Sequence, residues 1–390
     1  MPVTTNPVRT PTLTSRLPAV GTTIFTVMSA LAQQHSAVNL GQGFPDFECD
    51  PALPRHVSDA MGEGLNQYPP MAGVPALRHR VAAKIQALYG AAYDADSEIT
   101  VTAGATQALM TAVLCCVCPG DEVIVLEPCY DSYGPAIELA GGRVVRVPLT
   151  PGSFRPDFAR INAALSPRTR LLLINSPHNP TATVWTAAEM QQLADLLAPT
   201  DVLLLSDEVY EHMVYDGARH ISASSIPGLA ARSFVVSSFG KTFHVTGWKV
   251  GTVAAPAALT AEFRKVHQFN VFTVNTPMQH GLARYLADPQ PYLALPAFYQ
   301  RKRDLFRSGL APTRLRLLPS EGSYFQVVDY STVSSLPEAA FCEWLTREIG
   351  VAAIPVAAFY EGGFEQGLAR LCFAKCDETL ATALERLRKL

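Results

Sequence analysis

Short, continuous runs of apolar residues recur through the middle of the chain. They are rich in Val, Leu and Ile, and segments with helical spacing lie between several of them. Unbroken apolar runs are typical of strands buried on both faces of a parallel sheet that helices cover. The pattern therefore predicts an α/β fold with a mostly parallel sheet. We expect its strands within residues 98–104, 122–128, 143–149, 170–177, 201–208, 233–239 and 249–256.

Apolar residues at helical spacing predict the helices that accompany this sheet. Pro75 suits the first turn of one of them, because that position needs no backbone N–H donor. The predicted helices occupy residues 24–35, 75–90, 105–114 and 186–198.

The composition changes after residue 290, where we expect a smaller α+β domain to begin. Helical patterns at 292–310, 339–350 and 378–390 alternate there with strand patterns at 323–330 and 368–375. The predicted organisation is an N-terminal arm and helix over 1–45 that packs with the small domain, a large ligand-binding domain over 46–289 and the small domain over 290–390.

The bulk composition narrows the function classes. Of the 390 residues, 48% are hydrophobic and 17% are charged, which provides for a sizeable core. The net charge of −3 indicates no basic surface for nucleic acid or an anionic membrane. No apolar run reaches the ~18 residues of a membrane span. Residues 1–20 lack the apolar centre of a signal peptide, so we expect a flexible arm and a cytoplasmic protein.

The eight cysteines do not indicate disulfides or a metal site. A chain of this length without an export signal is not expected to depend on a disulfide framework. The CCVC run at 115–118 ends an apolar helix, where Cys acts as a small hydrophobic residue. Zinc would need a second ligand pair, and Cys372 with Cys376 lacks the usual short ligand spacing. We therefore expect no metal.

Polar motifs follow several predicted strands, at the sheet edge where α/β proteins bind ligands. GAT at 104–106 opens a helix whose backbone amides and Thr106 hydroxyl suit a phosphate. An ordinary strand–helix turn is the alternative. NSPHNPT at 175–181 presents the Asn179 amide, although a simple turn also explains this motif.

Two further motifs carry charge into apolar surroundings. Asp207 and Tyr210 belong to SDEVY, where the carboxylate is desolvated and needs a cationic partner unless it only caps a helix. SSFGKTFHVTGWKVG at 237–251 places Ser238, Lys241 and Lys249 among expected buried strands and a tight glycine turn. A desolvated lysine has a lowered pKa and acts as a nucleophile, whereas most lysines simply face solvent.

In this order the motifs match the needs of one cofactor, pyridoxal 5′-phosphate (PLP). Its aldehyde needs an amine, its ring nitrogen a carboxylate, its phenolic oxygen hydrogen-bond donors and its phosphate a cradle. GQG at 41–43 is not a dinucleotide fingerprint, because position 46 is Asp46 and no strand–helix unit follows.

The complete motif set resembles the class I/II aminotransferases of fold type I. TTIFTVMSALAQQHSAVNLGQGFPDF, NQYPPMAG, EPCYDSY, DEVYEH and SSFGKTFHVTGWKVG are most similar to the methionine, kynurenine and glutamine transaminase K branch, and especially to bacterial methionine aminotransferases. The resemblance covers residues 15–390 and implies a large PLP-binding domain, a small domain and a homodimer. Two positions depart from the family pattern: Ala182 replaces glycine in NPTAT, and Lys249 replaces the common arginine of GWR.

The resemblance also implies a role for each site residue. Lys241 bonds to the cofactor and carries a proton to and from the substrate. Arg370 in ARLCFAK holds the substrate carboxylate, while Gly43, Phe44 and Asn179 contact the substrate. The implied cofactor-binding residues are Ala105, Thr106, Tyr130, Asn179, Asp207, Tyr210, Ser238, Lys241, Lys249 and, from the neighbouring subunit, Tyr68.

The expected reaction moves the amino group of methionine to a 2-oxo acid, with aromatic amino acids, kynurenine and glutamine as further donors. Phe44, Tyr68, Phe359 and Tyr360 are expected at the side-chain end of the pocket, where a thioether packs well on aromatic rings. A cysteine-S-conjugate β-lyase, a kynurenine–oxoglutarate transaminase or an aminocyclopropane-carboxylate synthase-like enzyme would use the same residues. A ligand-sensing regulator of this fold needs a DNA-binding segment, for which the N-terminal arm is too short.

Overall fold

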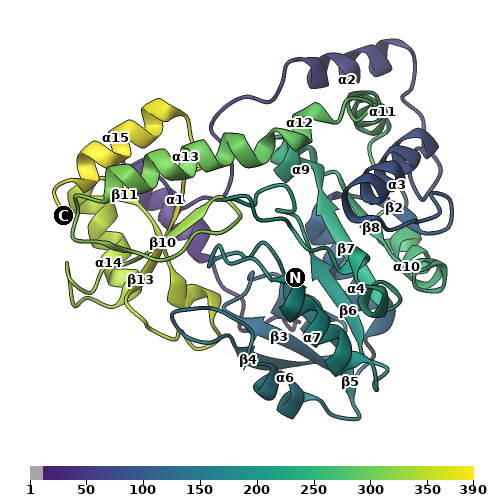
Figure 1. Cartoon of the computed structure of the whole chain (residues 1–390), viewed down its shortest axis with the longest axis horizontal. Coiled ribbons are helices and arrows are strands. Elements are labelled where there is room, and N and C mark those ends of the chain that lie inside the picture. The colour runs from purple at the N-terminus through teal and green to yellow at the C-terminus, as the bar shows by residue number, and fades with distance from the viewer. Residues whose placement is uncertain (1–11) are drawn as a thin grey trace, which may run out of the picture.

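The computed structural model describes residues 12–390 and confirms an α/β fold with a mostly parallel main sheet (Figure 1). The seven strands lie in the order β2 (Ile99–Thr102), β8 (Gly251–Ala254), β7 (Ser233–Ser238), β6 (Leu203–Asp207), β5 (Thr169–Asn175), β3 (Glu122–Glu127) and β4 (Arg143–Pro148). Neighbours from β7 to β4 are parallel, whereas β8 is antiparallel to both β2 and β7. Six of these seven strands fall within the ranges that the apolar runs predict, and β5 begins one residue before its predicted range, at Thr169.

Both faces of the main sheet are buried, which explains the unbroken apolar runs. Successive side chains of a strand point to opposite faces. Val123 and Val125 of β3 accordingly belong to one apolar cluster, while Ile124 and Leu126 belong to the cluster on the opposite face.

Helices connect the strands and cover the sheet (Figure 1). The predicted helices at 75–90 and 186–198 correspond to α3 and α7, and the start of α7 is fixed by a capping box between Thr186 and Glu189. The helices of this part of the chain are α2 (Ala52–Gly62), α3 (Pro75–Tyr89), α4 (Gly104–Cys116), α5 (Tyr133–Leu139), α6 (Phe158–Ala164), α7 (Ala187–Leu197), α8 (Pro227–Ala230), α9 (Phe239–Thr242), α10 (Ala257–Asn270), α11 (Thr276–Tyr285) and α12 (Gln290–Leu293), with 3₁₀ turns η1 (Ala223–Ser225) and η2 (Thr246–Trp248).

Sequence patterning did not predict α2, α10 or α11. The buried residues of α10 are Thr260, Phe263 and His267, so its inner face includes two polar side chains. Polar side chains on the inner face weaken the periodic signal on which the prediction of α10 depends.

The C-terminal part of the chain forms a second, antiparallel sheet. Its four strands lie in the order β12 (Ile354–Pro355), β13 (Leu368–Cys372), β10 (Phe325–Asp329) and β9 (Arg316–Leu317). The accompanying helices are α13 (Leu295–Leu310), α14 (Glu338–Trp344), α15 (Asp377–Leu387), the π-helical turn η3 (Leu345–Ile349) and the 3₁₀ turn η4 (Val356–Phe359). In Figure 1, α13 runs from α12, beside the main sheet, to the side of the molecule where α14 and α15 lie.

The N-terminal segment joins the C-terminal part. Helix α1 (Ile24–Gln34) begins at Thr23, whose side chain accepts a hydrogen bond from the Thr26 N–H, as expected for a helix over 24–35. It leads into β1 (Val38–Asn39), which pairs in parallel with β11 (Val351–Ala352). The division into an N-terminal arm over 1–45, a large domain over 46–289 and a small domain over 290–390 stays a prediction.

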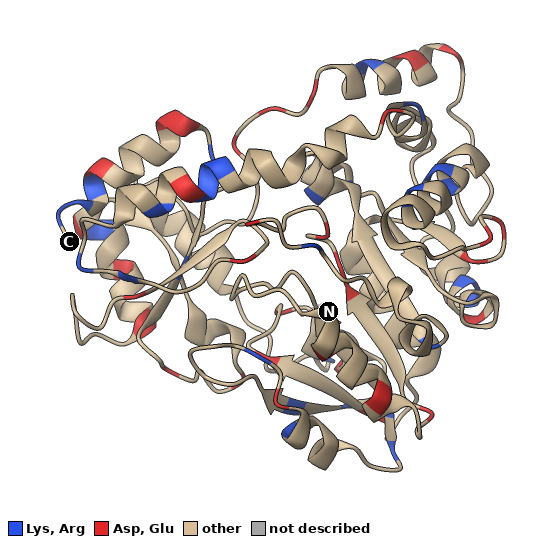
Figure 2. Cartoon of the chain, in the orientation of Figure 1, with Lys and Arg blue, Asp and Glu red and all other residues tan. Residues whose placement is uncertain are grey.

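Charged residues are mixed rather than segregated in the view of Figure 2, where α13 and α15 carry both acidic and basic positions. Within residues 12–390, no helix has the length and hydropathy that a membrane crossing needs.

Candidate active site

A cavity of about 480 Å³ opens at the carboxyl ends of β5, β6 and β7. Parallel strands deliver the polar residues that follow them to this common edge. Most of the predicted site residues line the cavity, namely Gly43, Phe44, Ala105, Thr106, Tyr130, Asn179, Asp207, Tyr210, Ser238, Lys241, Lys249 and Arg370, whereas Tyr68, Phe359 and Tyr360 do not.

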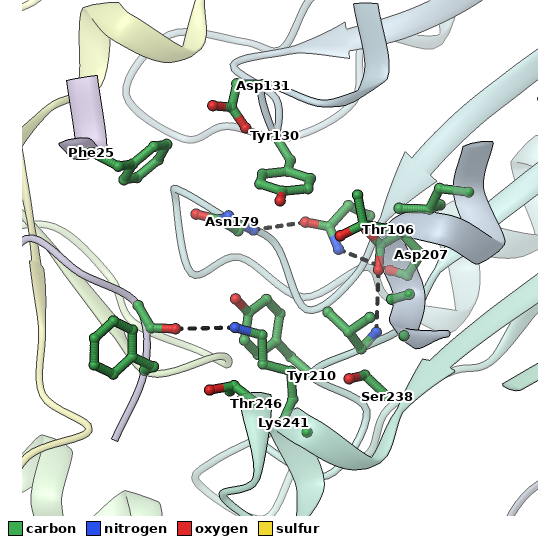
Figure 3. A pocket seen from close by; sticks show the side chains of 18 of the residues that line it. Phe25, Thr106, Tyr130, Asp131, Asn179, Asp207, Tyr210, Ser238, Lys241 and Thr246 are labelled. Carbon is green, nitrogen blue, oxygen red and sulfur yellow. Dashed lines mark hydrogen bonds between the residues drawn. The ribbon is translucent and has the colours of Figure 1, made fainter. Parts of the chain in front are cut away.

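Lys241 projects into the middle of this cavity (Figure 3). It lies on the short helix α9, directly after β7, rather than in the strand or glycine turn that we expected. Its Nζ donates hydrogen bonds to the Gly43 carbonyl at 3.0 Å and to the Tyr324 hydroxyl at 2.9 Å. Burial lowers the pKa of Lys241 to about 8, because an ammonium loses hydration there. The side chain is therefore a lysine amine that is readily deprotonated.

Asp207 is the last residue of β6 and is buried. The cationic partner that we expected is not among its hydrogen-bond partners in the described chain. The Tyr133 hydroxyl donates to its carboxylate at 2.7 Å instead, and the backbone N–H of Val209 donates at 3.3 Å. Burial raises the pKa of Asp207 to about 6, while the Tyr133 hydrogen bond opposes the rise. This carboxylate suits a cationic group of a ligand.

One end of the cavity has the features of an anion cradle. Gly104 begins α4 with a φ of 78°, so the helix N-terminus and the residues Ala105 and Thr106 face the cavity. Lys249 adopts a left-handed conformation with a φ of 55°. A Cβ atom placed on Gly104 would lie 3.4 Å from the Lys249 Nζ, so the ammonium lies against the start of the helix. Ser238 lines the same cavity from the end of β7.

Arg370 reaches the cavity from the second sheet, on β13, and is only 1% exposed. Its guanidinium donates to the Asn179 side-chain oxygen at 2.6 Å and to the Gly41 carbonyl at 2.7 Å, and it lies 4.0 Å from the Phe325 ring centre. Its Nε has no hydrogen-bond partner in the described chain. Burial lowers the pKa of Arg370 to about 10. A carboxylate ligand would supply the missing acceptor and countercharge.

Asn175 connects two of these groups and was not predicted. Its side-chain oxygen accepts from the Asn179 backbone N–H at 2.8 Å, and its amide donates to the Asp207 carbonyl at 2.8 Å. Tyr133 and Tyr324 were not predicted either. The bonds that they form to Asp207 and Lys241 cross long stretches of sequence, so no local pattern marks them. Phe25, on α1, also lines the cavity without having been predicted.

Three aromatic residues expected in the pocket lie elsewhere. Phe359 and Tyr360 are buried and do not line the cavity. Phe359 packs behind Arg370, with its ring centre 5.0 Å from the guanidinium carbon. Tyr68 lies outside the cavity of its own chain, is 80% exposed and makes an edge-to-face contact with Phe272. Of the four residues expected at the side-chain end, only Phe44 lines this cavity.

Comparisons with known proteins show the family of this chain. Residues 35–387 match the family model of aminotransferase class I and II. The chain belongs to this family. It is 54% identical to the methionine aminotransferase of Escherichia coli (strain K12), covering 96% of this chain and 98% of that protein. A crystal structure of an E. coli protein with an identified methionine aminotransferase function superposes with a TM-score of 0.96 at 53% identity, over 98% of this chain and 100% of that one.

More distant relatives have other named substrates. A probable N-succinyldiaminopimelate aminotransferase of Mycobacterium tuberculosis is 40% identical over 96% of this chain and 98% of its own length. Kynurenine–oxoglutarate transaminase 3 of Rattus norvegicus is 36% identical over 96% of this chain and 89% of its own length. The expected membership of this aminotransferase family is confirmed.

The family's cofactor is PLP, and the cavity suits it. Asp207 is a buried carboxylate able to pair with a ring cation, and the N-terminus of α4 with Lys249 faces an anion site. Lys241 provides the amine. Within residues 12–390, no cluster of His, Cys, Asp and Glu is arranged to hold a metal ion, and all eight cysteines are free thiols.

Proposed function

We propose that this aminotransferase moves the amino group of methionine to a 2-oxo acid. The observation that supports the choice of donor is the chemistry of the cavity wall. Phe25, Phe44, Tyr130 and Phe325 contribute aromatic rings, on which a thioether packs favourably. The 54% identity to a methionine aminotransferase supports the same choice.

The cations of the cavity argue against an acidic donor. Among the described lining residues these cations are Lys241, Lys249 and Arg370. The first provides the reactive amine, the second faces the anion cradle and the third is suited to the α-carboxylate. A donor such as aspartate would bury its second carboxylate without a partner, which is energetically unfavourable.

We assign the cofactor contacts as follows. PLP, when bound, supplies an electron sink that weakens the bonds to the substrate Cα. Ala105, Thr106, Ser238 and Lys249 would hold its phosphate, and Asp207 would hold the positive charge of its ring nitrogen. Asn179 and Tyr210 would contact the phenolic oxygen, and the ring of Tyr130 would complete the cofactor contacts.

Lys241 and Arg370 carry the substrate chemistry. Arg370 fixes the α-carboxylate by a bidentate pair, which orients the Cα–H bond. Lys241 would take the proton from that carbon as an amine and would deliver it as an ammonium to the cofactor carbon that takes over the amino group. A pKa of about 8 suits this exchange, because both forms are then accessible near neutral pH.

The test of the donor is kcat/KM for methionine and for aspartate with one fixed 2-oxo acid. We expect methionine to be the best donor of a panel that also includes aromatic amino acids, kynurenine and glutamine. A higher value for aspartate would overturn the pocket assignment. A higher value for kynurenine with 2-oxoglutarate would favour a kynurenine–oxoglutarate transaminase instead.

A cysteine-S-conjugate β-lyase on the same site is separated by its products. A lyase releases pyruvate and ammonia without any 2-oxo acid acceptor, whereas the proposed transaminase needs the acceptor for turnover. The Lys241→Ala variant is expected to lose transamination while still binding the cofactor non-covalently.

We also propose a cytoplasmic homodimer with shared active sites. The exposed Tyr68 is the residue that each chain would supply to the phosphate of the other. The eight free thiols fit a reducing compartment.

A further inference from the structure

Asp131 is a second acidic residue in the cavity, and the proposed reaction gives it no role. It follows Tyr130 in the loop between β3 and α5 and lines the same cavity as Arg370 and Lys241. In Figure 3 it lies beside Tyr130 on the side of Phe25, far from Lys241.

The charge of Asp131 is not neutralised by a direct partner. None of the ion pairs within residues 12–390 includes it, and the carboxylate of Asp207, the other acid of the cavity, pairs with Tyr133. The Asp131 side chain is exposed. Partial desolvation by the cavity wall raises its pKa, and the positive charge of Arg370 opposes that rise. Asp131 is therefore electrostatically linked to the guanidinium that we assign to the substrate α-carboxylate.

A substrate held at its α-carboxylate by Arg370 and at its amino group near Lys241 extends its side chain toward the remaining wall. Phe25, Tyr130 and Asp131 belong to that wall in Figure 3. A side-chain carboxylate there would meet a like charge. Because Asp131 is exposed, this repulsion is moderate and depends on the salt concentration. An uncharged side chain of the same shape would not be repelled.

We propose that Asp131 selects substrates by charge, disfavouring amino donors and 2-oxo acid acceptors that carry a second carboxylate. This inference rests on the proposed function and narrows it to donors and acceptors with uncharged side chains. Asp131 is a specificity residue in this scheme and takes no part in proton transfer.

Glutamine and glutamate provide the test, because they are nearly isosteric and differ by one charge. The full-length, PLP-loaded enzyme and its Asp131→Asn variant are assayed at pH 8 with phenylpyruvate as the fixed acceptor. We expect Asp131→Asn to raise kcat/KM for glutamate by roughly three- to tenfold and to change that for glutamine by less than about twofold. High salt should raise the value for glutamate in the wild type, because it screens the repulsion.

Matched variants separate charge from structure. Asp131→Glu keeps the charge and is expected to keep the discrimination. Glu138→Gln removes an exposed charge on α5 outside the cavity and is expected to leave both rates unchanged. If Asp131→Asn does not fold, the salt dependence of the wild type and the Asp131→Glu variant still decide the question.

The proposal is overturned if Asp131→Asn does not raise kcat/KM for glutamate, or if kcat/KM for glutamate and for glutamine change by the same factor. The proposal is also overturned if the ratio of kcat/KM for glutamate to kcat/KM for glutamine in the wild type does not change with ionic strength. Failure of the proposed function looks different, because the wild type would then transfer no amino group from methionine or from any other donor.

Discussion

Burial displaces the two central titrating groups of the site in opposite directions. It lowers the pKa of Lys241 to about 8 and raises that of Asp207 to about 6, since each group loses hydration of its charged form. Pairs of groups displaced in this way are typical of active sites, where acid and base functions must coexist near neutral pH. Both displacements have consequences that can be measured on the apoenzyme.

The first consequence is the reactivity of Lys241. Only the neutral amine attacks an electrophile, and an ordinary lysine is mostly neutral only above its usual pKa of 10.5. In the apoenzyme, we expect the rate of labelling of Lys241 by a small amine-reactive reagent to rise with a midpoint near pH 8. Peptide mass spectrometry measures this rate, with the exposed Lys265 as the internal control. Equal pH profiles for the two lysines would contradict a displaced pKa.

The second consequence is a conflict between stability and function at Asp207. A carboxyl whose pKa rises from 3.8 in the unfolded chain to about 6 in the folded chain stabilises the fold below pH 3.8 and loses that contribution as the pH rises through 6. At pH 8 the buried carboxylate therefore costs on the order of 2–3 kcal/mol. Asp207→Asn removes this cost.

We expect Asp207→Asn to raise the urea midpoint of the apoenzyme at pH 8, to lose that advantage toward pH 4 and to abolish most of the transaminase activity. Asp195→Asn, at an exposed position on α7, serves as the matched control and should change neither property. A variant that is less stable than the wild type at pH 8 would show that the buried charge is compensated within the protein.

At the scale of elements, the site depends on where strands end. Asp207 ends β6, Ser238 ends β7 and Lys241 follows one turn later, so the sheet places all three at one edge. Short motifs beside apolar runs marked these positions in the sequence. The helix N-terminus at Gly104, which follows β2, is the corresponding feature at the start of α4.

Gly104 is required both for its conformation and for its lack of a side chain. Its φ of 78° is unfavourable for alanine, and a Cβ would lie 3.3 Å from Lys249 Cε. We expect Gly104→Ala to weaken PLP affinity at least about tenfold and to lower stability by roughly 1–2 kcal/mol. Gly152→Ala is the control, because Gly152 has a φ of 79° with nothing within 4 Å of the added Cβ. If both variants lost the same PLP affinity, the effect would be due to backbone strain alone.

The sequence predicted residues whose neighbours along the chain define their place. The main sheet strands and the motifs around Lys241, Asp207 and Asn179 belong to this group, because each follows an apolar run directly. Tyr133 and Tyr324 were not predicted, although they donate to or accept from the central groups. Their roles arise from packing between distant segments, which hydrophobic periodicity does not encode.

The positions of Phe359 and Tyr360 illustrate the same limit. The family resemblance predicted these two residues at the end of the pocket that holds the substrate side chain. In the structure, the ring of Phe359 packs behind the guanidinium of Arg370 instead. Phe25 lines the cavity instead, because β1 pairs with β11 and brings α1 to the site. The pairing of two strands of two residues each leaves almost no trace in the sequence pattern.

At the scale of the whole molecule, the cavity lies where two sheets meet. Asp207 and Ser238 come from the parallel sheet, whereas Arg370 comes from β13 of the antiparallel sheet and donates to Gly41 of the N-terminal segment. The substrate carboxylate is thus assigned to the antiparallel sheet and the cofactor to the parallel sheet. A change in the relative position of the two sheets would alter substrate binding without altering the structure of either sheet.

In the proposed dimer, Tyr68 of a second copy of the chain also contributes to the site. It is 80% exposed and lies against Phe272, which is 44% exposed, so both rings are available to a partner. If Tyr68 acts in the neighbouring site, two defective variants can restore each other. A mixed dimer of Lys241→Ala and Tyr68→Ala contains one site with both residues intact and one site with neither.

We therefore expect a refolded equimolar mixture of Lys241→Ala and Tyr68→Ala, assayed at limiting PLP, to recover up to about a quarter of the wild-type activity. Half of the dimers are then mixed, and each of these has one complete site. The control mixture of Lys241→Ala with Arg370→Ala tests the geometry, because both residues line the same cavity of one chain and mixed dimers contain no complete site. Sedimentation of each mixture confirms that dimers have formed. Recovery no greater than the sum of the separate variants would place the function of Tyr68 within its own subunit or outside the site.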